Sequence, residues 1–186
     1  MVVYEATTQK QYGNIVQWLA RQPSDAFMLT CWGRLADVVK EQAHNLVVLE
    51  RWKQRFPSLA VFVCENDAGE IRCVLLRTLQ QKPEFNIPYP RVKIITAFID
   101  HEDYVKDDVT FFRELTYWAI KRDHKQFGVK EGEAILDAKS YSFVKKIFGE
   151  KAEKTTKPFL NPWFGTLWIV QLDFSDVLGA VSDGNF

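Results

Sequence analysis

Two apolar runs joined by a turn signal constrain the fold of this 186-residue chain more than any other feature. LAVFVCEN (59–66) is a continuous β-type run, DAG (67–69) is a turn signal, and EIRCVLLRTL (70–79) is a second β-type run. Two such runs separated by a short Gly-containing segment predict an antiparallel hairpin. The middle of the chain is therefore expected to be β-structure.

Helix and strand signals alternate on both sides of this hairpin. Helical spacing of Tyr12, Ile15, Trp18 and Leu19 predicts a helix capped by Thr7 or Thr8, and Ser140 is expected to cap a later one. A helix stripe of Phe111, Leu115, Trp118 and Ala119 is also expected. The full order is strand 2–6, helix 9–22, helix 25–56, hairpin 59–79, strand 91–100, helix 109–127, strand 132–138, helix 140–151 and strand 164–174. We expect one α/β domain over 1–186, with 175–186 as a frayed tail.

Composition excludes several classes of protein. Lysine and arginine total 24 against 24 aspartate and glutamate, which argues against a nucleic-acid partner. The N-terminus lacks a signal-peptide pattern, and no apolar run approaches the roughly 20 residues of a membrane helix. We therefore expect a cytoplasmic protein with no membrane partner. Cys31, Cys64 and Cys73 show no CxxC spacing, and the three histidines show no zinc spacing, so we expect reduced core thiols and no metal.

The order of elements resembles the GNAT superfamily of acyl-CoA-dependent N-acyltransferases over nearly the whole chain. The hairpin is similar to that family's second and third strands, RVKIITAFID (91–100) to its fourth, and AILDAKSYSFVKKIFGEK (134–151) to its fifth strand and following helix. ERWKQRFPSLAVFVCEN (50–66) also resembles glycine N-acyltransferases. The resemblance implies an α/β (α+β) fold with a mixed, mostly antiparallel central sheet flanked by helices.

The resemblance also implies a binding site for acetyl-CoA or another acyl-CoA as cosubstrate. In that family the fourth and fifth strands splay apart, and the pantetheine arm pairs with the backbone of the fourth strand. Here that backbone belongs to Thr96, Ala97, Phe98 and Ile99. Lys145 belongs to a lysine-rich stretch that would attract phosphate by charge.

The phosphate loop departs from the family pattern. In members of the family this loop has the sequence pattern Gln/Arg-x-x-Gly-x-Gly/Ala, because close approach of the backbone to phosphate requires glycine. Segment 100–108 contains no glycine and carries five acidic residues against a single Lys106. One interpretation is a solvated acidic loop whose Asp107 and Asp108 cap the next helix. The other is a remodelled CoA site, or carboxylates that face an amine substrate.

Candidate catalytic residues flank this segment. His101, because histidine is the side chain best suited to exchange protons near neutral pH, or Glu102 would act as the general base at the end of the fourth strand. Tyr141 would protonate the leaving thiolate, since Lys145 occupies the position four residues before Gly149 where the family places its tyrosine. An exposed loop histidine and a packed tyrosine are the alternative interpretations.

Two functions follow from these observations. The first is an N-acyltransferase that moves an acyl group from acyl-CoA to a small-molecule or peptide amine. The second is a catalytically inactive GNAT-like domain that binds a protein or ligand, or that serves as the accessory half of a two-domain transferase. The sequence leaves both open, together with the oligomeric state.

Overall fold

The computed structural model of the chain describes residues 1–22, 54, 58–80, 91–161 and 165–179. The expected helix 25–56, apart from residue 54, and the Pro-rich connection 82–90 lie outside the described residues. Among the described residues, no helix has the length and apolar character needed to span a bilayer.

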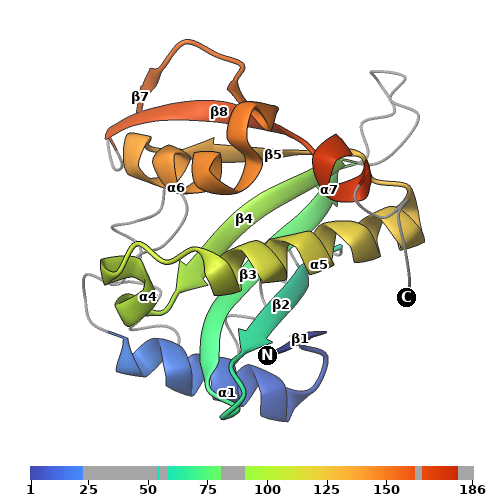
Figure 1. The fold of residues 1–186 in the computed structure, drawn as a ribbon, viewed down its shortest axis with the longest axis vertical. Helices are drawn as coiled ribbons and strands as arrows, with labels where there is room; N and C mark the ends of the chain where they lie inside the picture. Colours follow the sequence, from blue (N-terminus) through green and yellow to red (C-terminus); the bar gives the residue numbers. More distant parts are fainter. Residues whose placement is uncertain (23–53, 55–57, 81–90, 162–164, 180–186) are drawn as a thin grey trace.

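An eight-stranded mixed sheet forms the centre of the molecule (Figure 1). Its order is β1-β2-β3-β4-β5-β8-β6, and β7 pairs with β8. The β4–β5 pair is parallel, and the other pairs are antiparallel. The strands are β1 (Val2–Glu5), β2 (Ala60–Glu65), β3 (Ile71–Gln80), β4 (Arg91–Ile99), β5 (Glu131–Leu136), β6 (Ala152–Lys154), β7 (Phe159–Asn161) and β8 (Gly165–Asp173). The predicted hairpin and the mostly antiparallel sheet are confirmed.

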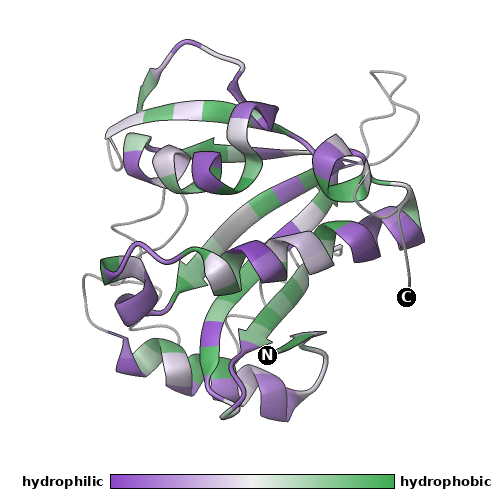
Figure 2. Ribbon diagram, viewed as in Figure 1, coloured by the Kyte–Doolittle hydropathy of each residue, from purple (hydrophilic) through white to green (hydrophobic). Residues whose placement is uncertain are grey.

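Helices cover both faces of the sheet. The helices are α1 (Gln9–Arg21), α4 (His101–Val105), α5 (Thr110–Phe127), α6 (Ala138–Phe148) and α7 (Ser175–Gly179), and the 3-10 turn η2 (Gly149–Lys151) follows α6. Ile15 and Trp18 of α1 pack on one face in a cluster with Val61 and Val74. The other face lies under α5 and α6 (Figure 1), where Phe62 and Leu75 contribute to the larger core cluster. Alternate residues of β2 and β3 therefore face opposite helical layers, which explains the continuous apolar runs (Figure 2).

The stripe of α5 that faces the core differs slightly from the predicted one. Leu115 and Ala119 are buried as predicted, but Phe111 and Trp118 are only partly buried, and Phe112 lies in the core instead. Phe111 and Phe112 are one residue, about 100°, apart on the helix, so both cannot face the core equally. The stripe is therefore rotated relative to the prediction.

Three further local predictions are corrected by the structure. Asp137, not Ser140, caps α6, because its Oδ1 accepts the Ser140 N–H at 2.7 Å. The first part of the expected frayed tail is ordered, since Ser175–Gly179 form α7 with Val177 buried, and residues 180–186 lie outside the described residues. The start of segment 100–108 is helical rather than an open loop, since Asp100 caps α4.

The prediction that the cysteines are core thiols is confirmed for Cys64 and Cys73. Cys64 and Cys73 are opposite each other in the β2–β3 ladder, and both are fully buried free thiols. Burial raises the pKa of the Cys73 thiol well above its ordinary value, whereas the hydrogen bond with Cys73 lowers the pKa of Cys64. Cys31 lies outside the described residues.

Candidate active site

Strands β4 and β5 pair at one end only. The register joins Val92 to Gly132 and Lys93 to Glu133. Both strands continue, β4 to Ile99 and β5 to Leu136, with no further β4–β5 pairing between the described residues. The edge of β4 that faces β5 therefore carries backbone N–H and C=O groups that have no strand partner in the part of the chain that the structure describes.

A β-bulge in β4 lies where the pairing stops. Leu76 of β3 is opposite Thr96, whereas Arg77 is opposite Ile94, so Ile95 is the extra residue. A bulge bends its strand and increases the local twist, which turns β4 away from β5. The backbone predicted to bind the pantetheine arm, residues 96–99, lies beyond this bulge. Ala97 and Ile99 point into the larger core and Phe98 into the smaller one, so the backbone and not these side chains forms the free edge.

The unpaired stretch between β4 and β5, beyond Lys93 and Glu133, is called the β4–β5 opening below. Gly132 lies at its closed end, where the two strands pair. A Cβ built at this position would lie 2.6 Å from Cζ of Phe174 and 3.2 Å from the Val92 carbonyl oxygen. The Phe174 ring in turn packs against Phe148, with ring centroids 6.0 Å apart. The absence of a side chain at Gly132 thus permits the close contact between β4, β5 and the residue after β8.

An ion-pair network fixes the junction between β4 and α4. Nε of Arg72, on β3, donates to Oδ2 of the buried Asp103 at 3.0 Å, and a second guanidinium nitrogen bonds the other oxygen. The same guanidinium lies 3.4 Å from Oδ1 of Asp100. The hydrogen bond with Asp103 raises the pKa of Arg72, which keeps the pair charged. Bidentate geometry of this kind holds α4 firmly against the end of β3.

His101 begins α4, directly beyond the free edge of β4. Its backbone N–H donates to Oε1 of Gln22 at 3.1 Å, and Nε2 of Gln22 donates to Asp100 at 3.4 Å. The imidazole is partly buried, and its Nδ1 has no hydrogen-bond partner within the described part of the chain. A buried ring nitrogen without a partner is able to accept or donate a proton to a bound molecule. Glu102, the next residue, is exposed and pairs with Lys106 at 3.7 Å.

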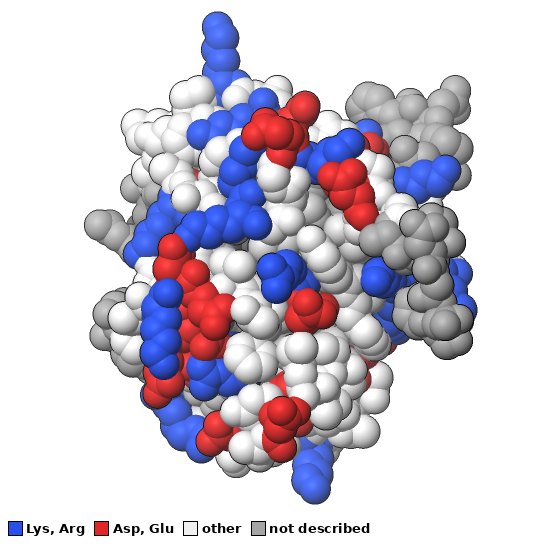
Figure 3. All heavy atoms as spheres, in the orientation of Figure 1, with Lys and Arg blue, Asp and Glu red and all other residues white. Residues whose placement is uncertain are grey.

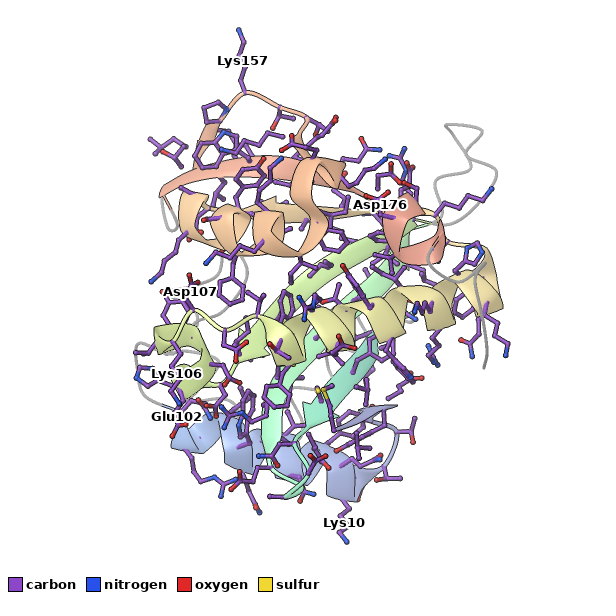
Figure 4. All side chains as sticks on the ribbon, in the orientation of Figure 1. Lys10, Glu102, Lys106, Asp107, Lys157 and Asp176 are labelled. Carbon is purple, nitrogen blue, oxygen red and sulfur yellow. The ribbon has the colours of Figure 1, made fainter. Side chains whose placement is uncertain are left out.

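Side chains of α4 meet those of α6 beside the opening. The Tyr104 and Phe143 ring centroids are 6.4 Å apart, and Lys139 Nζ lies 4.3 Å from the centroid of Tyr104. Lys146 forms an ion pair with Asp107, which lies between α4 and α6 in Figure 4. These contacts join the two sides of the opening at the surface.

Carboxylates of the chain accept backbone N–H groups at the start of three helices at this edge of the sheet, as side-chain caps in α4 and α6 but not in α5, whose N-cap is Val109. Asp100 accepts the Glu102 N–H at 3.1 Å, Asp108 accepts the Thr110 N–H at 2.8 Å, and Asp137 caps α6 as described above. The hydrogen bonds with Thr110 lower the pKa of Asp108, so this carboxylate is ionised at neutral pH. The N-cap residue of α5 is Val109 and not Asp107 or Asp108 as expected; Asp108 accepts the first N–H of the helix from one position further back, and Asp107 pairs with Lys146.

Tyr141 and Lys145 lie apart from His101. The Tyr141 hydroxyl donates to the Ala152 carbonyl of β6 at 3.2 Å, and Lys154 lies 4.3 Å from its ring centroid. Tyr141 is two residues, about 200°, from Phe143, which faces α4, so the two side chains leave α6 on opposite sides. Lys145 pairs with Glu150 at 3.2 Å. The structure thus brings His101 and Glu102 together with residues 96–99, but it does not bring Tyr141 to them.

Sequence reasoning missed Gln22, Arg72 and Ser140. Gln22 and Arg72 contact Asp100 from 78 and 28 positions away in the sequence, so no local spacing could have identified them. Ser140 was expected as a cap, yet its hydroxyl is fully buried and has no partner among the described residues. A serine one turn before Phe143 on the buried stripe of α6 was the available signal.

Comparison with solved structures identifies the architecture. A GNAT-family acetyltransferase from Streptococcus pneumoniae superposes with a TM-score of 0.61 at 10% identity, covering 91% of this chain and 96% of that one. A ribosomal-protein-alanine N-acetyltransferase from Brucella melitensis gives 0.60 at 12% identity, with 93% and 99% covered. An aminoglycoside N(6′)-acetyltransferase from Legionella pneumophila gives 0.56 at 16% identity, with 96% and 95% covered.

The chain therefore has the GNAT fold, and the predicted fold class is confirmed. No family model matches its sequence, and no curated protein matches it. The likeness to glycine N-acyltransferases stays a prediction.

Proposed function

We propose that this protein is an N-acyltransferase that moves an acyl group from a thioester, acyl-CoA, to an amine. The observation that carries the proposal is the free backbone edge of β4 beyond the Ile95 bulge, with His101 at its end. An extended amide-containing chain can pair with such an edge as an added strand does. The pantetheine arm has two amides and ends in the thioester, so pairing would bring the reacting carbonyl near the end of β4.

The proposed reaction exchanges one acyl bond for another. The amine nitrogen forms a C–N bond to the acyl carbon, the C–S bond breaks, and the electron pair of that bond leaves with the thiolate. One proton is lost from the amine and one is gained by the sulfur, so the products are an amide and a free thiol. The protein's part is to orient the two reactants and to move these protons.

His101 is the proposed general base. Its Nδ1, which has no hydrogen-bond partner among the described residues, would take the proton of the amine, and the Gln22 bond to its backbone fixes the start of α4. Glu102 is the second candidate base, although its exposure and its pairing with Lys106 suit a role in attracting the amine better.

The acceptor is proposed to be a cationic small molecule or a peptide amine. The carboxylates of Glu102, next to His101, and of Asp107, just after α4, are exposed and favour an ammonium group over a neutral or acidic one. Solved structures with the same fold include spermidine and aminoglycoside N-acetyltransferases, which act on cationic amines.

The roles of Tyr141 as the acid and of Lys145 as a phosphate contact stay predictions. Tyr141 could protonate the thiolate only after exchanging its hydrogen bond to Ala152 for one to sulfur. Lys145 could contact a phosphate only after leaving Glu150, an exposed pair of low strength.

A second candidate function is a non-catalytic GNAT-like domain. The observation that favours it is the set of contacts that join α4 to α6 beside the opening, Tyr104–Phe143, Lys139–Tyr104 and Lys146–Asp107. If these contacts always hold α4 and α6 together, no thioester can reach the backbone of β4.

A thiol-release assay separates the two functions. Acetyl-CoA is offered with spermidine, an aminoglycoside or an alanine-terminated peptide, and free thiol is measured over time. Amine-dependent thiol release supports the transferase, and its absence with every amine, together with no binding of acetyl-CoA by calorimetry, rejects it.

A pair of variants tests the base. His101→Gln is expected to lower the turnover number about 100-fold or more at neutral pH. His124→Gln is the matched control, since His124 lies at the other end of α5 with its Nδ1 on the Val129 carbonyl. Equal activity of His101→Gln and wild type removes His101 from the mechanism.

A further inference from the structure

A carboxylate accepts one backbone N–H group at the start of each described helix at the β4–β5 opening. Free N–H groups at a helix start form a natural site for a phosphate. Here Asp100 accepts the N–H of Glu102 in α4, Asp137 that of Ser140 in α6, and Asp108 only the first N–H of α5, whose N-cap residue Val109 makes no side-chain hydrogen bond. A phosphate approaching any of the three helix starts would therefore meet a carboxylate of the protein.

The remaining charges around the opening also disfavour a diphosphate. Among the described residues, six carboxylates lie on or beside α4 and at the helix starts, against five cations. The carboxylates belong to Asp100, Glu102, Asp103, Asp107, Asp108 and Asp137, and the cations to Arg72, Lys106, Arg113, Lys139 and Lys146. Figure 3 shows acidic side chains gathered over α4, with basic side chains of α6 next to them.

Each of these five cations already has an internal partner. Arg72 is bound to Asp103, Lys106 to Glu102, Lys146 to Asp107 and Arg113 to Glu114, while Lys139 lies over the Tyr104 ring. A bound diphosphate would therefore compete with the carboxylates for these cations. It would also be repelled by the carboxylates themselves, because like charges repel.

The pantetheine part of the same donor meets a different surface. It is uncharged apart from its phosphate end, and its amides match the unpaired N–H and C=O groups of β4 beyond Ile95. The opening thus fits one half of an acyl-CoA molecule and not the other.

We propose that this protein recognises its acyl donor through the pantetheine thioester arm alone and does not hold the nucleotide diphosphate. The inference rests on the proposed acyl transfer and narrows its donor to the class of acyl-pantetheine thioesters. Acyl-CoA is one member of that class. Bond making and breaking are those of the proposed reaction, because the nucleotide takes no part in them.

Two donors and one competitor test this inference. Acetyl-pantetheine and acetyl-CoA are compared by kcat/KM with the same amine, and pantetheine and CoA are compared by calorimetric Kd. We expect ratios below tenfold in both measurements. An enzyme that makes two charge-assisted hydrogen bonds to the diphosphate would show about 100-fold or more. Adenosine 3′,5′-bisphosphate at millimolar concentration is expected not to inhibit.

A charge variant supplies an independent readout. Glu102→Gln with Asp107→Asn removes two carboxylates that cap no helix, and it is expected to strengthen CoA binding at least threefold while leaving pantetheine binding unchanged. Glu153→Gln, an exposed carboxylate on β6, is the control and is expected to change neither Kd.

The outcomes separate the two proposals. A preference of tenfold or more for acetyl-CoA, or inhibition by the bisphosphate, overturns the inference and leaves acyl transfer intact. Transfer from neither donor overturns the proposed function, and the inference with it.

Discussion

Phe174 lies directly over Gly132, so close that a Cβ at position 132 would come within 2.6 Å of its ring. Because Gly132 is opposite Val92 in the short β4–β5 ladder, this contact sits at the closed end of the opening. The width of that end is therefore set by a glycine and one aromatic ring.

Gly132→Ala is expected to destabilise the protein. The added methyl group must displace the buried Phe174 ring, which costs about 1–3 kcal/mol in a packed core. Gly13→Ala is the matched control, because nothing lies within 4 Å of its Cβ and alanine favours helix α1. Urea unfolding measures both, and a Gly132→Ala variant as stable as wild type would show that the contact is not tight.

The buried pair of Arg77 and Asp123 is expected to respond strongly to single changes. Both side chains are almost fully buried, and Arg77 also donates to the Ser58 carbonyl at 2.7 Å. Asp123→Leu leaves the buried charge of Arg77 without a carboxylate, at a cost of about 3–5 kcal/mol, whereas Arg77→Met leaves Asp123 with Arg122 alone, 3.3 Å away, and should cost less.

The double variant Arg77→Met with Asp123→Leu should lose less stability than the sum of the single variants. Lys145→Met, which breaks an exposed pair, should change stability by less than about 1 kcal/mol. Additive losses in the double-mutant cycle would mean that the two charges do not interact.

Ser140→Ala is expected to raise the stability of the ligand-free protein. The Ser140 hydroxyl is buried without a partner among the described residues, and such a group costs about 1–3 kcal/mol. Thermal unfolding should show a higher Tm for Ser140→Ala and no comparable rise for Ser142→Ala, which is exposed. A lower Tm for Ser140→Ala would show that the hydroxyl makes a stabilising bond.

Asp108→Asn should flatten the acid side of the stability profile. The pKa of Asp108 is lower in the folded protein than in the unfolded chain, so its stabilisation is fully present above its ordinary pKa of 3.8. That stabilisation is lost as the pH falls through the lower, folded value. Asparagine can accept the same N–H without a charge. The free energy of unfolding, measured with urea, should therefore fall less steeply between pH 5 and pH 2 in the variant. Parallel profiles would rule out this contribution of Asp108.

Most of the fold was predictable because its signals are local. Apolar runs, a Gly turn at 67–69 and helical spacing around Trp18 depend only on neighbours in the sequence. The Ile95 bulge was not predicted, since nothing in RVKIITAFID distinguishes an extra residue from a regular one. Bulges depend on the register of the partner strand, which local sequence does not contain.

The candidate site was predictable only in outline. Residues 96–99 and His101 were predicted from the resemblance to the GNAT superfamily, and in the structure they form the end of β4 and the start of α4. The partners that hold α4 come from other elements, Arg72 from β3 and Gln22 from the end of α1. The acidic segment looked like a solvated loop because the pairing of Asp103 with Arg72 is a tertiary contact.

Amide hydrogen exchange across β4 tests the central claim most directly. The claim is that the backbone of residues 96–99, beyond the last β4–β5 pair, binds the thioester arm of the donor. Saturating pantetheine or CoA should slow exchange in a peptide that covers these residues, and it should leave a β8 peptide over Val170–Leu172 unchanged. Unchanged exchange in residues 96–99 at saturating concentrations of both ligands would contradict the claim.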